Sequence, residues 1–168
     1  MNRLLVILIS GCFLYCSTKP EGVRQMPDLY SQIIDTSGFA FDSSMAAALG
    51  ADDYGMKSYV LAFLKSGPNR SQDSVTAAEL QRAHLANIRR MAREKKLVFA
   101  GPFLDDGAVR GIYIFNTEST AEAESWTNTD PAIQAGRLVM ELHPFYGSAV
   151  LSLMVPLSQK ITRTNIAE

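Results

Sequence analysis

Segments typical of strands and helices alternate in a fixed order from Lys57 to Leu142, and this order constrains the fold more than any other feature of the chain. Apolar runs rich in β-forming residues and closed by turn residues predict strands. Four runs meet this description: Tyr59–Leu64, Leu97–Ala100, Val109–Phe115 and Leu138–Leu142. With helices after the first and third strands, the order is β-α-β-β-α-β, which predicts an α+β fold, a ferredoxin-like sandwich.

Helix starts are marked by residues that cap the first turn. Thr76–Glu79 and Ser119–Glu122 match capping boxes, so each opens a predicted helix. Asp130 is the predicted N-cap of a further short turn, because proline, here Pro131, is favoured at the first helical position. After the fourth strand, the apolar residues 149–155 are interpreted as a fifth strand at the sheet edge.

The predicted sheet is apolar on both faces. The first strand alternates between two apolar sets, Tyr59, Leu61 and Phe63 on one face and Val60, Ala62 and Leu64 on the other. One layer of helices covers only one face, so the second face needs another partner. We therefore expect a homodimer with its sheets packed face to face, a dimeric α+β barrel. A tail or a lipid ligand over this face is the alternative.

The N-terminus carries the features of an export signal. The basic Arg3 precedes the apolar run Leu4–Ile9, which is far too short to span a bilayer, since about 20 apolar residues are needed. Ile9–Cys12 resembles a bacterial lipobox, which predicts lipidation of Cys12 and an exported, membrane-anchored lipoprotein of the bacterial cell envelope. Because Phe13–Tyr15 continue the apolar character, an uncleaved anchor, a differently cut signal or a misassigned start codon are the alternatives.

The chain divides into four predicted parts. Residues 1–16 form the leader, and residues 17–55 form either a tether or an N-terminal extension packed on the domain. The folded α+β domain spans 56–155, and 156–168 form a C-terminal tail. Within the second part, Met26–Ile34 and Met45–Leu49 are predicted as short helical turns.

Composition argues against several functions. The net charge is −1 and no long run of Lys or Arg occurs, so no nucleic-acid partner is expected. The basic residues from Arg89 to Lys96 are instead interpreted as complementing the dipole at a helix C-terminus. Both cysteines, Cys12 and Cys16, lie in the leader, which leaves none in the domain for a disulfide, a zinc site or a nucleophile. Nucleotide-binding glycine motifs are also missing, so we expect no cofactor.

Several short motifs resemble the YCII-related family of small dimeric α+β barrel proteins. The motifs are Ala83-His84-Leu85 in the first helix, Leu97 to Pro102 on the next strand, Asp130-Pro131, and Ala135-Gly136. The resemblance covers about 56–148 and implies a pocket that contains a His–Asp pair. Carried over by motif, the catalytic pair is His84 and Asp130. The export leader departs from the shortest family members and argues against a cytoplasmic metabolic role.

The position of His84 has two interpretations. His84 follows Leu80 by four residues and precedes Ile88 by four, so it shares the core-facing side of the helix. A histidine at such a position is either a satisfied core residue or, as the resemblance implies, an acid–base group that works near neutral pH. In the second case Asp130 would orient the ring and stabilise its charged form.

Six further residues are candidates for the pocket: Phe103, Asp105, Asp106, Tyr113, Trp126 and His143. Asp105 and Asp106 precede Gly107, so they form either a turn or the pocket mouth. Strand alternation places Arg137, Glu141 and His143 on one face, either as a solvated edge or as a polar row that lines a cavity. A metal site built on the two histidines is geometrically conceivable, but none is predicted.

These observations lead to two hypotheses about function. The first is a cofactor-free acid–base enzyme of the isomerase or lyase type, acting on a small ring or carbonyl compound, which rests mainly on the family resemblance. The alternative is a non-catalytic module at the cell envelope that binds a small ligand or serves as a scaffold. The enzyme requires His84 beside a carboxylate in a concave site, whereas the scaffold would have His84 packed and no cavity beside it.

Overall fold

The computed structural model describes residues 40–164. The predicted leader with Cys12, the Met26–Ile34 turn and the last four residues lie outside this range. The described helices are α2 (Ser43–Leu49), α3 (Ser74–Arg93), α4 (Thr120–Thr127), α5 (Pro131–Gln134), the 3₁₀ helix η1 (Ala149–Leu153) and α6 (Met154–Ile161). The strands are β1 (Met56–Ser66), β2 (Leu97–Pro102), β3 (Val109–Phe115) and β4 (Leu138–Ser148).

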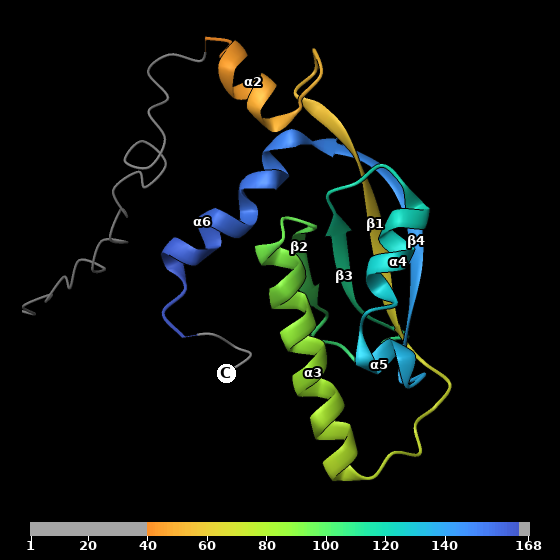
Figure 1. Cartoon of the computed structure of the whole chain (residues 1–168). Coiled ribbons are helices and arrows are strands. Elements are labelled where there is room, and N and C mark those ends of the chain that lie inside the picture. The colour runs from red at the N-terminus through yellow and green to blue at the C-terminus, as the bar shows by residue number, and fades with distance from the viewer. Residues whose placement is uncertain (1–39, 165–168) are drawn as a thin grey trace, which may run out of the picture. The chain divides into compact units, whose positions relative to one another are not determined.

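The four strands form one antiparallel sheet in the order β2-β3-β1-β4. Helices α3 and α4 lie on the same face of this sheet (Figure 1). This arrangement confirms the predicted α+β, ferredoxin-like fold. β1 and β4 are longer than the predicted strands, because their pairing continues from Ser66↔Leu138 to Met56↔Ser148.

The helix-covered face holds the main core. Alternate residues of β1 and β3 are buried there with residues of α3, β2 and α4: Val60, Ala62, Met91, Leu97, Tyr113, Phe115 and Ala123. The Phe115 ring meets the rings of Tyr113 and Trp126 edge-on, with centroids 5.8 and 6.0 Å away. These contacts fix β3 against the helices, so Tyr113 has a defined position on the side where α3 passes.

The opposite face is covered only in part by the described residues. Near η1, Tyr59, Val98 and Ile114 are buried, with Leu151 packed against them. Farther along β1, Leu61 and Phe63 are half-buried. The apolar face predicted from the sequence therefore exists, and the homodimer that would cover it stays a prediction.

The first helix starts earlier than predicted. Asp73, not Thr76, is the N-cap of α3, and its carboxylate accepts hydrogen bonds from the backbone N–H groups of Val75 (2.9 Å) and Thr76 (3.0 Å). The Thr76 hydroxyl itself donates to Asp73. The capping box at Thr76 was therefore a wrong prediction, because Asp73 caps the helix three residues earlier and Thr76 already lies in its first turn. The N-cap at Ser119 is confirmed.

The predicted fifth strand at 149–155 is also wrong. These residues form η1 and the first turn of α6, and α6 continues to Ile161 beside β2 (Figure 1). A short apolar run does not distinguish a strand from a buried helix by periodicity alone. Pro156 fits here because the first turn of a helix needs no N–H from it. No helix within residues 40–164 combines the length and apolar character needed to cross a bilayer.

Candidate functional site

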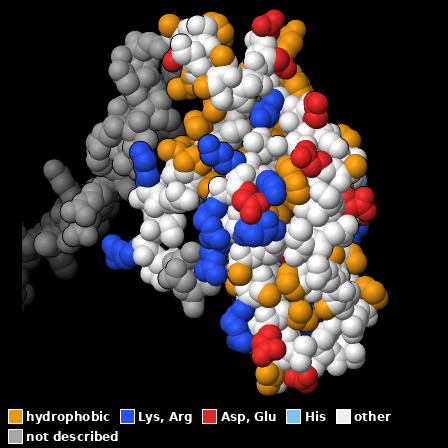
Figure 2. Space-filling view, viewed as in Figure 1, with side chains coloured by type: hydrophobic (Ala, Val, Ile, Leu, Met, Phe, Trp, Pro, Cys, Tyr) orange, Lys and Arg blue, Asp and Glu red, His pale blue; other side chains and the backbone are white. Residues whose placement is uncertain are grey.

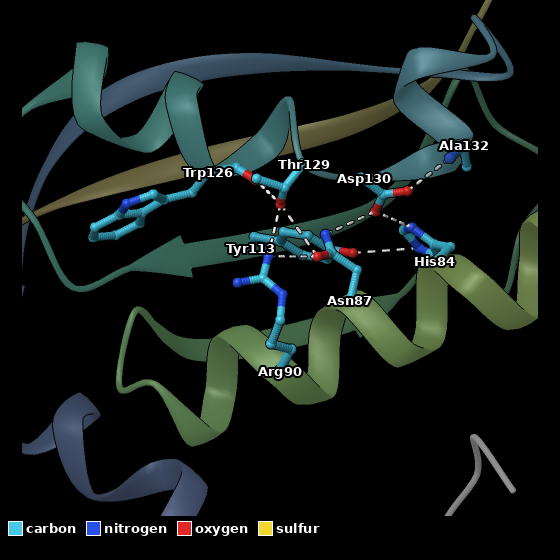
Figure 3. A network of polar contacts seen from close by, with 8 residues as sticks. All are labelled: His84, Asn87, Arg90, Tyr113, Trp126, Thr129, Asp130 and Ala132. Atoms are coloured by element: carbon cyan, nitrogen blue, oxygen red, sulfur yellow. Dashed lines mark hydrogen bonds and ion pairs between the residues drawn. The ribbon is translucent and has the colours of Figure 1, made fainter.

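His84 and Asp130 form a buried pair between α3 and the start of α5. His84 Nδ1 lies 2.6 Å from Asp130 Oδ2, and the two residues are 5% and 0% exposed (Figure 3). His84 comes from the middle of α3, on the face that packs toward the sheet. Asp130 comes from the loop between α4 and α5, 46 residues later. The fold therefore joins the two residues that the family resemblance singled out.

Asp130 is held in place by its role as a helix cap. Its Oδ1 accepts a hydrogen bond from the backbone N–H of Ala132 at 2.9 Å, as the Asp130-Pro131 sequence predicted. Its Oδ2 accepts from His84 Nδ1 and lies 3.5 Å from Asn87 Nδ2. Three N–H donors thus surround the carboxylate, so its buried oxygens have hydrogen-bond partners.

A second layer of polar contacts supports the pair. Arg90 Nη2 donates to Asn87 Oδ1 at 2.7 Å and to Thr129 Oγ1 at 2.8 Å (Figure 3). These bonds orient the Asn87 amide so that its NH₂ group points toward Asp130, and they attach the Asp130 loop to α3. Sequence reasoning missed Asn87 and Arg90. The signal was available, because His84, Asn87 and Arg90 follow one another at three-residue spacing on one helix face.

Tyr113 lies on the other side of the His84 ring. Its hydroxyl is 3.3 Å from His84 Nε2, and the two rings are nearly parallel with centroids 6.3 Å apart. Burial raises the pKa of Tyr113 above its usual range, and the negative charge of Asp130 raises it further. The phenol therefore keeps its proton and donates it toward Nε2. Together, the Asp130 and Tyr113 contacts favour the tautomer with the proton on Nδ1 and the lone pair on Nε2.

His84 lines a cleft of about 290 Å³, which we call the His84 cleft. Its other walls come from the ends of β1, β2 and β4 and from α5, and they include Leu64, Phe103, Ala132 and Leu138. Three arginines also line it: Arg70, Arg110 and Arg137. No carboxylate is among the described residues that line it, since Asp130 is buried behind His84. The result is a small cationic and partly apolar hollow beside a histidine.

The other candidates from the sequence lie at different distances from this cleft. Phe103 lines it, and Tyr113 lies behind His84 without lining it. Trp126 is in the helix-side core against Phe115, away from the cleft. Asp105 and Asp106 are exposed in the β2–β3 turn, where Asp106 lies 3.9 Å from Arg110 and neither lines the cleft.

His143 lies on the sheet face that α3 and α4 do not cover. Its Nε2 is 2.8 Å from Glu141, and its ring contacts Phe63 edge-on. Hydrogen bonds from Lys65 and then from His143 hold the pKa of Glu141 below its usual range. The predicted polar row is thus present for Glu141 and His143 only. Arg137 departs from it because it precedes β4 and lines the His84 cleft instead.

Basic side chains gather over the C-terminal half of α3, with acidic side chains among them (Figure 2). Glu94 pairs there with Arg90 at 3.0 Å and with Lys96 at 2.7 Å. Within the described part of the chain, no three His, Cys, Asp or Glu side chains come close enough together to hold a metal ion.

The fold and the buried pair define a small ferredoxin-like α+β domain with a His–Asp site. The model of the YCII-related domain matches residues 60–145, a range that contains both His84 and Asp130. The chain therefore belongs to the YCII-related domain family.

No curated protein matches the chain. A similar solved structure is 5-chloro-2-hydroxyhydroquinone dehydrochlorinase (TftG) from Burkholderia phenoliruptrix AC1100 in complex with 2,5-dihydroxybenzoquinone. It is 23% identical, with a TM-score of 0.40, and the match covers 52% of this chain and 92% of that one.

Proposed function

We propose that the protein is an enzyme that transfers protons by acid–base chemistry, without a cofactor, on a small ring or carbonyl compound. Isomerisation and elimination are the reaction types that fit. One observation carries the proposal: His84 lines a cleft while Asp130, fully buried, accepts the hydrogen bond of its Nδ1. A histidine that served only to pack the core would need a hydrogen-bond partner but no cleft beside it.

In this proposal the substrate displaces the Tyr113 hydroxyl from His84 Nε2, and this nitrogen then removes a proton from a carbon next to a carbonyl or ring group. The imidazolium that forms is stabilised by Asp130, whose position is fixed by Ala132 and Asn87. The same nitrogen then returns the proton to another atom of the substrate, or protonates a leaving group. Positioned acid–base catalysis of this kind contributes about 10²–10⁴-fold to a rate. Tyr113 acts as a positioning residue, because its retained phenol proton keeps Nε2 an acceptor.

Exchange of substrate protons with solvent tests the proposal without knowledge of the full reaction. A panel of small ring and carbonyl compounds is incubated in D₂O with the protein, and loss of carbon-bound protons is followed by ¹H NMR. We expect exchange for at least one compound, reduced about 10²-fold or more by His84→Gln. His143→Gln is the matched control and should leave the rate unchanged, since His143 lies on another face. Equal rates for His84→Gln and wild type would contradict the proposal.

The alternative is a non-catalytic module that captures a small ligand. It is favoured by the same cleft, whose three arginines would suffice for binding. Saturable binding in the His84 cleft with no exchange in any compound would favour this module. The test therefore separates the two functions: the enzyme exchanges protons of a bound ligand through His84, whereas the binding module does not.

We further propose that the protein acts as a homodimer anchored to the bacterial cell envelope by a lipid on Cys12. The half-buried Leu61 and Phe63 on the uncovered sheet face support the dimer. Light scattering coupled to size-exclusion chromatography tests the dimer, with Phe63→Glu expected to yield monomers.

The proposed lipid anchor rests on the lipobox-like sequence alone. Mass spectrometry of the mature chain from a bacterial host, with Cys12→Ser beside it, tests the anchor.

A further inference from the structure

Three arginines from distant parts of the sequence meet at the His84 cleft. Arg70 follows β1, Arg110 lies in β3, and Arg137 precedes β4. Apart from His84, they are the only ionisable side chains among the described residues that line it. The cleft therefore combines a threefold positive charge with a single histidine.

Close backbone contacts bring two of these arginines together. The N–H of Gly67 donates to the carbonyl of Arg137 at 2.8 Å, and that of Asn69 donates to Gly136 at 3.0 Å. A Cβ on Gly67 would lie only 2.2 Å from the Gly136 oxygen, so this approach requires glycine. Arg70 Nη1 then reaches the Arg137 carbonyl at 3.3 Å. The turn after β1 is thus attached to the segment before β4.

The partners of the three guanidinium groups are mostly neutral. Arg70 donates to a backbone carbonyl, and Arg137 Nη1 donates to the side-chain oxygen of Gln72 at 3.2 Å. Arg110 donates to the carbonyl of Asp105, and its one carboxylate neighbour, Asp106, is 3.9 Å away and fully exposed. Neutral acceptors hold Arg70 and Arg137 in place without cancelling their charge, and the exposed Asp106 offsets the charge of Arg110 only in part.

Three basic groups elsewhere in the described part of the chain have carboxylate partners. Lys65 pairs with Glu141, and Arg90 and Lys96 both pair with Glu94. No carboxylate pairs with Arg70 or Arg137 within residues 40–164. Uncompensated guanidinium groups beside a hollow favour an anion there, because planar donors of this kind match the geometry of a carboxylate.

We propose that the His84 cleft binds a small organic carboxylate, with the carboxylate held by Arg70, Arg110 and Arg137. The body of the ligand lies against Phe103, Leu64 and Leu138, which brings a neighbouring carbon to His84. A cleft of about 290 Å³ is at the small end of ligand pockets, so it suits a molecule of about one ring. This inference names the substrate class of the proposed acid–base enzyme and rests on that function for its role in turnover.

Three probes of similar shape and different charge test the inference. Benzoate, benzamide and benzylamine are titrated into the full-length protein in detergent, and binding is measured by calorimetry and ligand-observed NMR. We expect benzoate to bind at least tenfold more tightly than benzamide, and benzylamine not to bind. A charge-assisted hydrogen bond of ordinary strength accounts for such a factor.

Substitutions show whether the arginines cause this preference. Arg70→Gln and Arg137→Gln should each weaken benzoate binding about tenfold and leave benzamide unchanged. Arg93→Gln, which removes an exposed charge from the end of α3, is the matched control and should have no effect. Arg70 is itself exposed, so its variant separates loss of charge from loss of fold. Equal affinity for benzoate and benzamide, no binding of benzoate, or wild-type affinity in both variants would overturn the inference.

His84→Gln distinguishes failure of this inference from failure of the proposed function. It should retain benzoate binding within about threefold, because the carboxylate contacts the arginines rather than the ring. Proton exchange that depends on His84, without a preference for benzoate over benzamide, would support the acid–base function and contradict the proposal that the ligand is a carboxylate. Binding of benzoate that depends on the arginines, with no exchange in any compound, would support the carboxylate ligand and contradict the acid–base function.

Discussion

His84 and His143 both lie beside a carboxylate, at 2.6 Å from Asp130 and at 2.8 Å from Glu141. The two pairs differ in their surroundings. His84 and Asp130 are buried, have further donors around the carboxylate, and border a cleft. His143 and Glu141 are exposed on β4. Water replaces a lost partner at the exposed pair, whereas the buried pair has no substitute, so burial decides which pair has consequences.

The largest expected difference between the two pairs is the loss of stability when the carboxylate of each, Asp130 or Glu141, is removed. Asp130→Ala removes the cap of α5 and leaves buried donors unpaired, so the free energy of unfolding should fall by about 3–5 kcal/mol. Glu141→Ala should cause a much smaller loss, because its side chain is exposed within the subunit and only a contact with the proposed second copy would change. Urea unfolding followed by circular dichroism measures both. Similar losses in the two variants would remove the distinction between the pairs.

Tyr113 gives a second test of the buried site, through the pH dependence of the free energy of unfolding. Burial, followed by the charge of Asp130, raises the pKa of Tyr113, so the folded protein keeps a proton that the unfolded chain loses near pH 10. Stability from this group is complete below about pH 10 and falls above it, by up to about 1.4 kcal/mol per pH unit. Tyr113→Phe should flatten this alkaline loss in urea unfolding at about pH 8 to 11.

The control for Tyr113 is the exposed Tyr146. A hydrogen bond to Asp52 raises the pKa of Tyr146 as well, but solvent surrounds this pair. Tyr146→Phe should therefore change the alkaline profile much less than Tyr113→Phe. An equal change in the two variants would show that the burial of Tyr113 has no energetic consequence.

Much of the fold was predictable because apolar runs and turn residues are local signals. The order of the four strands and the cap at Ser119 follow from such signals and are confirmed. The start of α3 was missed because two adjacent segments both resemble caps, and the earlier one, Asp73, accepts the N–H groups of Val75 and Thr76. The segment 149–155 was missed because its apolar run has no period that separates a strand from a helix.

The site was predictable only in part. Helical spacing indicated that His84 faces the core, and the Asp130-Pro131 sequence indicated a cap, but only the family resemblance connected the two residues. The three arginines were not predictable, because Arg70, Arg110 and Arg137 meet through the pairing of strands and through a glycine contact between two turns. No local pattern in the sequence encodes such a meeting.

The central claim is that Asp130 fixes the His84 ring with its proton on Nδ1, so that Nε2 is the nitrogen that accepts a proton. Long-range ¹H–¹⁵N NMR of the histidine rings at about pH 8.5, where an ordinary imidazole is neutral, tests this claim directly. We expect His84 to show a protonated Nδ1 and an unprotonated Nε2, His143 to show a mixture of tautomers, and Asp130→Asn to remove the preference at His84. A proton on Nε2 of His84 in the wild-type protein would contradict the account.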